Sequence, residues 1–132
     1  MGVFKVKALI WNPQDLSRKY EVELIVDTGA TYTVLPNSLL EKLGVKPFRT
    51  IRLRLADGRV VEKPLGEIGI EIMGYRASAT PVVFGEENIY LLGSVTLEQL
   101  SLAPDPIEKK LKPVEALLML VVVELKQERI SR

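Results

Sequence analysis

Apolar and polar residues alternate over several short stretches of this chain, a pattern typical of strands that bury one face. Residues 4–11 begin with strict alternation, and residues 19–26 place apolar side chains on one face and glutamates on the other. Turn-forming residues lie between the two stretches, at Asn12-Pro13-Gln14-Asp15. We therefore expect a hairpin whose second strand leads directly to Asp27.

Two more hairpins follow from the same reasoning. Residues 48–55 alternate and lead into Ala56-Asp57-Gly58-Arg59, where Asp-Gly supplies the positive φ angles of a tight turn. Residues 60–63 lead the chain back, and Pro64 disfavours a central-strand position there. Farther along, apolar stretches flank a turn at Gly74-Tyr75, which predicts the next hairpin.

Short helices and strands complete the pattern. A helix can start at Pro36 or Asn37 and end at Gly44, and residues 95–100 have the features of a second short helix. Other expected segments are a fully apolar strand at residues 89–92, a loop that contains Asp105, and strands at residues 107–112 and 117–125. Since no internal repeat is present, we expect one mostly β domain over residues 1–132 with one or two short helices.

The composition limits the classes of partner. The chain has 132 residues, of which 47% are hydrophobic, enough for a buried core in one domain. Its 18 basic and 17 acidic residues give a net charge of +1, which favours neither nucleic acid nor an acidic membrane surface as a partner. The longest apolar run, residues 116–123, is far shorter than the roughly 20 residues of a membrane-spanning helix. Lys5 and Lys7 interrupt the first apolar run, unlike a secretory signal, so we expect a soluble, cytoplasmic protein with no nucleic-acid or membrane partner.

Histidine and cysteine are both absent. Their absence excludes disulfides, Cys–His and Ser-His-Asp nucleophilic sites, and zinc sites built from Cys and His. Carboxylates, lysine and tyrosine remain as titratable groups for chemistry, and we expect no metal and no cofactor.

The tripeptide Asp27-Thr28-Gly29 stands between two apolar runs. It can be a simple turn, since Asp and Gly favour turns. It also suits an aspartic peptidase, in which two carboxylates about 3 Å apart share one proton and act as base and acid on a bound water and the peptide carbonyl. Gly29 would let the backbone approach and donate hydrogen bonds to the carboxylate.

No other aspartate of the chain lies in such a loop. Asp15, Asp57 and Asp105 sit in turns or between prolines, and none is followed by Thr-Gly or Ser-Gly. A peptidase of this kind would therefore need a second copy of the chain to supply the second Asp27 across a two-fold axis.

Three blocks in order carry a resemblance to a known family. Residues 24–30 contain Asp27-Thr28-Gly29-Ala30, residues 51–61 form the hairpin with Ala56-Asp57-Gly58 at its tip, and residues 89–93 end in Leu91-Leu92-Gly93. With these blocks the chain resembles the retropepsin-like aspartic peptidases, a homodimeric family of retroviral and retrovirus-like proteases, over roughly residues 3–102. The resemblance implies a closed β-barrel of the retropepsin type.

The same resemblance implies roles for individual residues. Asp27 would be catalytic, Thr28 would brace the paired loops across the dimer, and Gly29 would support the loop and line the cleft. Contacts with a peptide or protein substrate are implied for Ala30, for Leu92, and for the tip of the flap, a hairpin that closes over substrate in this family: Ala56, Asp57 and Gly58.

The chain also departs from the retroviral pattern. The flap strands carry Arg52, Arg54 and Arg59, and Ser94 stands where retroviral enzymes have an arginine. The apolar residues 116–125, after the family match, can be a core strand or a strand that pairs with its mate across a dimer.

We expect a homodimeric aspartic endopeptidase on these grounds. Two other functions stay open. The fold can serve as a dimeric peptide-binding or scaffolding module with little proteolytic activity, or the chain can be a monomeric β-barrel in which Asp-Thr-Gly is only a turn.

Overall fold

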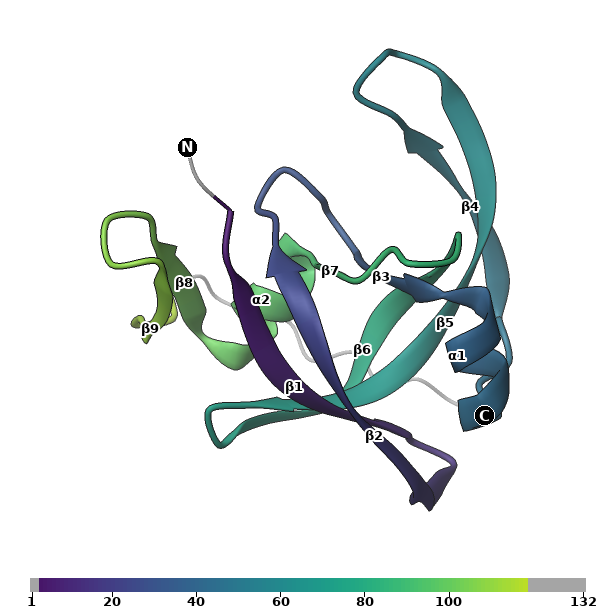
Figure 1. The fold of residues 1–132 in the computed structure, drawn as a ribbon, viewed down its shortest axis with the longest axis horizontal. Helices are drawn as coiled ribbons and strands as arrows, with labels where there is room; N and C mark the ends of the chain where they lie inside the picture. Colours follow the sequence, from purple (N-terminus) through teal and green to yellow (C-terminus); the bar gives the residue numbers. More distant parts are fainter. Residues whose placement is uncertain (1–2, 119–132) are drawn as a thin grey trace, which may run out of the picture.

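The structure, a computed structural model, describes residues 3–118. It is mostly β with two short helices, as the alternating pattern predicts (Figure 1). The helices are α1 (Asn37–Leu43) and α2 (Ser94–Leu100). The strands are β1 (Lys5–Asn12), β2 (Asp15–Val26), β3 (Thr33–Pro36), β4 (Arg49–Arg54), β5 (Val60–Ile72), β6 (Tyr75–Gly85), β7 (Leu91–Leu92), β8 (Leu102–Asp105) and β9 (Lys110–Pro113).

Seven strands pair in the order β1-β2-β7-β3-β6-β5-β4, and β1 also pairs with β5. Six strands therefore follow one another in a ring, from β1 through β2, β7, β3, β6 and β5 back to β1. Among the described residues, β4 pairs with β5 alone, and β8 and β9 form a separate hairpin. This arrangement agrees with a protease fold; its description as a closed barrel stays a prediction.

The core lies inside this ring and under the two helices. Alternate side chains of the strands point inward, as expected of strands that bury one face. Residues with no measurable exposure include Ile10, Leu24, Leu35, Ile68, Ile70 and Leu92 from the strands, and Leu40 and Leu43 from α1.

The hairpin turns form at or next to the glycines where the sequence predicts them. The β5–β6 turn lies at Met73-Gly74, one residue before the predicted Gly74-Tyr75, because Tyr75 already begins β6. Met73 and Gly74 both have positive φ angles, 55° and 84°, as in the type I′ turns that match strand twist. Gly58, at the β4–β5 turn, likewise has a φ of 89°.

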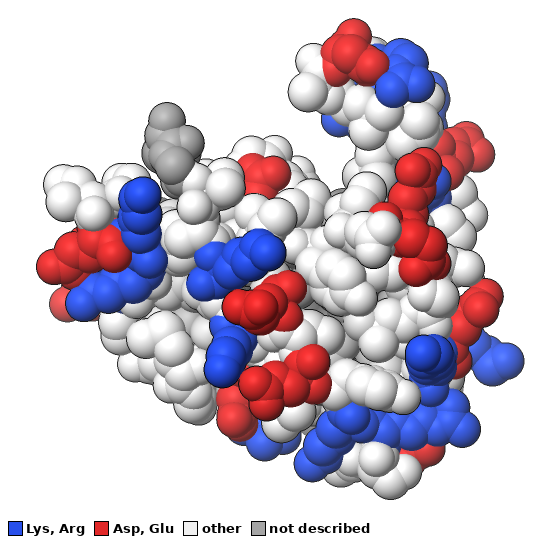
Figure 2. Space-filling model, viewed as in Figure 1, with Lys and Arg blue, Asp and Glu red and all other residues white. Residues whose placement is uncertain are grey.

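The β4–β5 hairpin projects from the body of the molecule as a curved arm (Figure 1). In the space-filling view a hollow separates this arm from the body, and both basic and acidic side chains gather at its tip (Figure 2). Pro64 lies within β5 and pairs with Thr50, so the strand continues through it. The pairing with β6 begins only at Leu65, so at Pro64 the strand has a neighbour on one side, where proline is tolerated.

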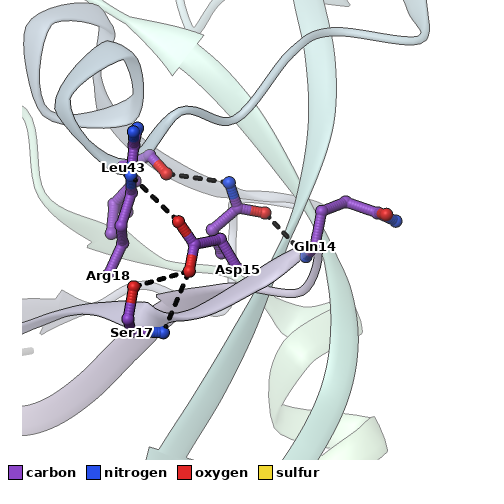
Figure 3. A network of polar contacts seen from close by, with 6 residues as sticks. Gln14, Asp15, Ser17, Arg18 and Leu43 are labelled. Atoms are coloured by element: carbon purple, nitrogen blue, oxygen red, sulfur yellow. Dashed lines mark hydrogen bonds and ion pairs between the residues drawn. The ribbon is translucent and has the colours of Figure 1, made fainter.

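Asn12 fixes the end of α1 to the β1–β2 hairpin. Its buried side chain donates a hydrogen bond to the Leu43 carbonyl at 2.8 Å and accepts one from the Gln14 amide at 2.8 Å. Beside it, Asp15 accepts from Ser17 and pairs with an arginine of β2 (Figure 3). The open carbonyl at the helix end is thereby satisfied by the neighbouring hairpin.

The last part of the described chain differs from the expectations. The strand predicted at residues 89–92 is only Leu91–Leu92. Asp105 ends β8 instead of lying in a loop, and the next strand begins at Lys110 because residues 106–109 form a turn. Residues 116–118 are exposed and outside any strand, and the remainder of the predicted strand 117–125 lies outside the described residues.

Candidate active site

Asp27 is the first residue after β2, and its backbone is held from both sides. The Val26 amide donates to the Phe4 carbonyl at 3.0 Å, and the Asp27 amide donates to the Leu92 carbonyl at 3.1 Å. At this point β2 lies between two strands, of which β1 runs antiparallel and β7 parallel to it. The end of β2 therefore delivers Asp27 to a fixed position.

The loop after β2 folds back on the Asp27 carboxylate. The Gly29 amide donates to Asp27 Oδ1 at 2.9 Å, and the Ala30 amide donates to the Asp27 carbonyl at 3.2 Å. A Cβ atom on Gly29 would stand 3.2 Å from Oδ1, closer than most Cβ contacts. Glycine thus gives the carboxylate room to lie against the backbone, as the sequence predicts.

The start of α2 binds the other end of this loop. The Ser94 amide donates to the Ala30 carbonyl at 2.8 Å, and the Val95 amide donates to the Thr31 carbonyl at 3.0 Å. The first amides of a helix have no partner within the helix, so here the loop supplies acceptors for them. The block that ends in Gly93 therefore serves to hold the Asp27 loop.

A cleft of about 550 Å³ opens beside Asp27. Of the lining residues within 3–118, Asp27 is the one with a titratable side chain, and most of the others are apolar. The lining consists of Val3, Phe4, Val26, Asp27, Thr28, Gly29, Pro104 and Pro106.

A second cleft, of about 500 Å³, lies along the β4–β5 hairpin. Its walls are mainly apolar and come from β3, β4, β5, β6 and β7, with charged side chains among them. Lys63 and Glu86, both in this lining, form an ion pair at 3.8 Å. The apolar lining residues are Val34, Leu53, Leu55, Val61, Val83, Ile89 and Leu91.

The structure brings together some of the residues named from the sequence and separates others. Asp27, Thr28 and Gly29 share one cleft, whereas half-buried Ala30 lines neither cleft. The flap-tip residues Ala56, Asp57 and Gly58 are exposed at the end of the projecting hairpin and line neither cleft.

Leu92 is placed differently from the expectation that it touches substrate. Its side chain has no exposure, so it packs in the core and contributes to the site through its carbonyl. The preceding residue, Leu91, lines the second cleft instead. The physical reason is strand alternation, which sends neighbouring side chains to opposite faces.

Several lining residues were missed from the sequence. Leu53 and Leu55 had a usable signal, because they alternate with arginines on β4 and so share one face of the hairpin. Phe4 follows from the register of the first hairpin once its pairing is known. Pro104 and Pro106 had no local signal, since they approach Asp27 only through the tertiary fold.

The three other aspartates are bound within their own turns. Hydrogen bonds from Ser17 lower the pKa of Asp15, and those from the Arg59 amide and guanidinium lower the pKa of Asp57. A hydrogen bond from a lysine of β9 lowers the pKa of Asp105 to about 2. None of the three lines the cleft beside Asp27.

Within residues 3–118, no group of three or more acidic side chains is arranged to hold a metal ion. No helix in that range has the length and apolar character needed to cross a membrane. The cytoplasmic location stays a prediction.

Comparison with known proteins identifies the family. A family model described as aspartyl protease matches residues 15–104, close to the range 3–102 over which the resemblance was noted. No curated protein matches the chain. The matched range contains the Asp27 loop, the β4–β5 hairpin and the Leu91-Leu92-Gly93 block, so the chain belongs to the retropepsin-like aspartyl protease family.

Proposed function

We propose that this protein is an aspartic endopeptidase that works as a homodimer, with one Asp27 from each copy in a single active site. The observation that carries the proposal is that, among the described residues, Asp27 is the one titratable side chain lining its cleft. Membership of the aspartyl protease family supports a peptidase, and the chemistry needs two carboxylates. Among the described residues of one chain, no second carboxylate reaches the cleft. A second copy of the chain would therefore supply it.

The proposed reaction uses the two Asp27 side chains with one shared proton. The ionised carboxylate takes a proton from water as the water oxygen attacks the peptide carbonyl carbon. The protonated carboxyl gives its proton to the carbonyl oxygen, which forms a tetrahedral diol. The carboxyl that took the water proton then gives it to the peptide nitrogen as the carbon–nitrogen bond breaks, the other carboxylate takes a proton from a diol hydroxyl, and both products leave with the shared proton restored.

The rest of the site has roles that follow from its position. The β4–β5 hairpin would act as the flap and close over an extended peptide, which would lie along the apolar cleft of Leu53, Leu55 and Leu91. The ring of six strands would be the closed barrel of the family, holding the Asp27 loop rigidly.

Cleavage of an unfolded protein at several pH values tests the proposal. We expect the full chain to cut it, a transition-state-mimic peptide to inhibit the cutting, and Asp27→Asn to lower the rate on the order of 10³-fold or more. Asp15→Asn is the matched control, because Asp15 is a half-buried aspartate of the β1–β2 hairpin that does not line the cleft. Equal rates for wild type and Asp27→Asn would contradict the proposal, as would binding of peptides without cleavage.

Mixing the two chains tests the sharing of the site. If each site needs two Asp27 residues, an equal mixture of wild type and Asp27→Asn that has exchanged subunits keeps about one quarter of the activity. If one chain alone made the whole site, the same mixture would keep about half of the activity. Sedimentation that shows a monomer at concentrations where the enzyme is active would also overturn the dimer.

A further inference from the structure

A single peptide unit connects Asp27 to a buried hydroxyl. The carbonyl of Leu92 accepts the Asp27 amide at 3.1 Å, and the amide of Gly93, on the other side of the same peptide bond, donates to Thr33 Oγ1 at 3.1 Å. Because a peptide unit is planar and rigid, its two hydrogen bonds are fixed together. The orientation of this peptide decides where the Asp27 backbone is held.

Thr33 belongs to a chain of three threonine hydroxyls. Thr33 Oγ1 lies 2.6 Å from Thr96 Oγ1, and Thr96 Oγ1 lies 2.8 Å from Thr80 Oγ1. The three residues come from β3, α2 and β6, and none has measurable exposure. A hydroxyl is costly to bury unless it is hydrogen-bonded, and valine would fill the same space without that cost. Three bonded threonines at fully buried positions therefore indicate a need for their hydroxyls.

The hydroxyl chain reaches elements that are far apart in the sequence. Thr33 follows the Asp27 loop directly, whereas Thr96 stands in the first turn of α2, next to the amides that bind the same loop. Thr80 joins both to β6, a long strand of the ring. The three hydroxyls thus tie the loop, the Leu92–Gly93 peptide and α2 to the sheet.

We propose that Thr33, Thr96 and Thr80 form a positioning chain, in which the Thr33 hydroxyl orients the Leu92–Gly93 peptide and thereby fixes Asp27. The three threonines touch neither cleft and act on the reaction through the backbone. The effect on catalysis rests on the proposed peptidase function, whereas the effect on the Asp27 backbone does not.

Replacement of Thr33 separates the hydroxyl from the shape of the side chain. Thr33→Val keeps the shape and leaves the Gly93 amide without its acceptor, and Thr33→Ser restores the hydroxyl. We expect Thr33→Val to lower kcat about tenfold to hundredfold with KM within about twofold, and Thr33→Ser to recover most of the loss. Ile72→Val, a buried change at the far end of β5, controls for general destabilisation and is expected to leave kcat unchanged.

Amide hydrogen exchange followed by NMR gives a readout independent of activity. In Thr33→Val the Gly93 and Asp27 amides are expected to exchange at least about tenfold faster, whereas the amide of Ile70 in β5 keeps its rate. Unchanged protection of Gly93 and Asp27 would overturn the positioning chain, and so would a Thr33→Ser variant as impaired as Thr33→Val. If wild type cuts no substrate but the exchange behaves as expected, the peptidase proposal fails and the positioning chain stands.

Thr80→Val offers a second variant if Thr33→Val does not fold. It removes the Thr80 hydroxyl, at the opposite end of the chain from Gly93, and keeps Thr33 as the acceptor for the Gly93 amide. We therefore expect the same changes in kcat and in amide exchange, but smaller ones. No change in either kcat or Asp27 exchange in this variant would contradict a role for the far end of the chain.

Discussion

Gly93 packs directly on the backbone of the Tyr32–Thr33 peptide. A Cβ atom at Gly93 would overlap the Tyr32 carbonyl and stand 2.7 Å from the Thr33 nitrogen. These neighbours are backbone atoms next to the buried residue Thr33, so they cannot move aside as a side chain could. The glycine of the third sequence block is therefore required by contact between two backbone segments.

Gly93→Ala is expected to lower the free energy of unfolding by about 2 kcal/mol or more, because the overlap must be relieved by shifting the Asp27 loop or α2. Urea denaturation followed by circular dichroism measures the loss. Gly74→Ala is the matched control, since its positive φ costs an alanine about 1 kcal/mol while the space around it is open. A smaller loss for Gly93→Ala than for Gly74→Ala would contradict the steric explanation.

Trp11 lies against Gly69 on one side and under Arg76 on the other, with the guanidinium carbon 4.5 Å from the ring centroid. A Cβ at Gly69 would overlap the indole, so Gly69→Ala is expected to displace the ring from its buried position. Because the chain has one tryptophan, the displacement can be followed as a red shift of the emission spectrum. An unshifted spectrum with unchanged stability would show that the contact is looser than described.

Asn12→Ala removes the hydrogen bond that joins α1 to the first hairpin and a second one within the hairpin turn. The Leu43 carbonyl and the Gln14 amide lose their partner, and we expect a loss of about 1–3 kcal/mol in the free energy of unfolding. Chemical denaturation checks this value. Asn37→Ala is the control, since Asn37 is an exposed asparagine bonded only to Glu41 across one helical turn, and its loss should be within about 0.5 kcal/mol.

The Asp105–Lys112 pair makes stability depend on pH at the acidic end. A hydrogen bond from Lys112 is the main cause that lowers the pKa of Asp105 from 3.8 to about 2. Because the pKa of Asp105 is lower in the folded than in the unfolded state, its ionised carboxylate stabilises the folded protein. This stabilisation is present above about pH 4 and is lost as the pH falls towards 2. Wild type is expected to exceed Asp105→Asn in melting temperature at pH 6 and to lose most of this difference by pH 2.

Thermal melts over this pH range, with Glu67→Gln as an exposed-carboxylate control, measure the difference. The difference in melting temperature between wild type and Asp105→Asn should largely close between pH 4 and pH 2. The difference between wild type and Glu67→Gln should not change in this way over the same range. A difference that persists undiminished at pH 2 would show that the Asp105 ion pair is not its source.

The sequence was most informative where local chemistry decides the structure. Asp57-Gly58 and the turn at Gly74 specify positive φ angles within a few residues, so the hairpins could be predicted from short stretches. The Asp27 loop could be predicted because an apolar strand, a carboxylate and a glycine occur in direct succession.

The remaining features depend on contacts between distant residues. Thr33, Thr80 and Thr96 are ordinary strand or helix residues until the fold brings their hydroxyls together. Asp105 is a different case: it stands between two prolines, which favours a loop, yet pairing with Lys110 of β9 in a local hairpin makes it the end of a strand. Strand pairing outweighed the local preference there.

The two-residue strand β7 has a consequence for how the protein opens. Among the described strands, β7 alone pairs with both β2 and β3, because Leu91 pairs with Ile25 on one side and with Val34 on the other. The fewest ladder bonds in the ring are therefore at the place where the Asp27 amide is held. A fluctuation that detaches residues 91–92 would open the ring of strands and release the Asp27 loop in the same event. Resistance to local unfolding at β7 and the position of Asp27 are thus one property of the described chain, and loosening there displaces Asp27 before the rest of the fold opens.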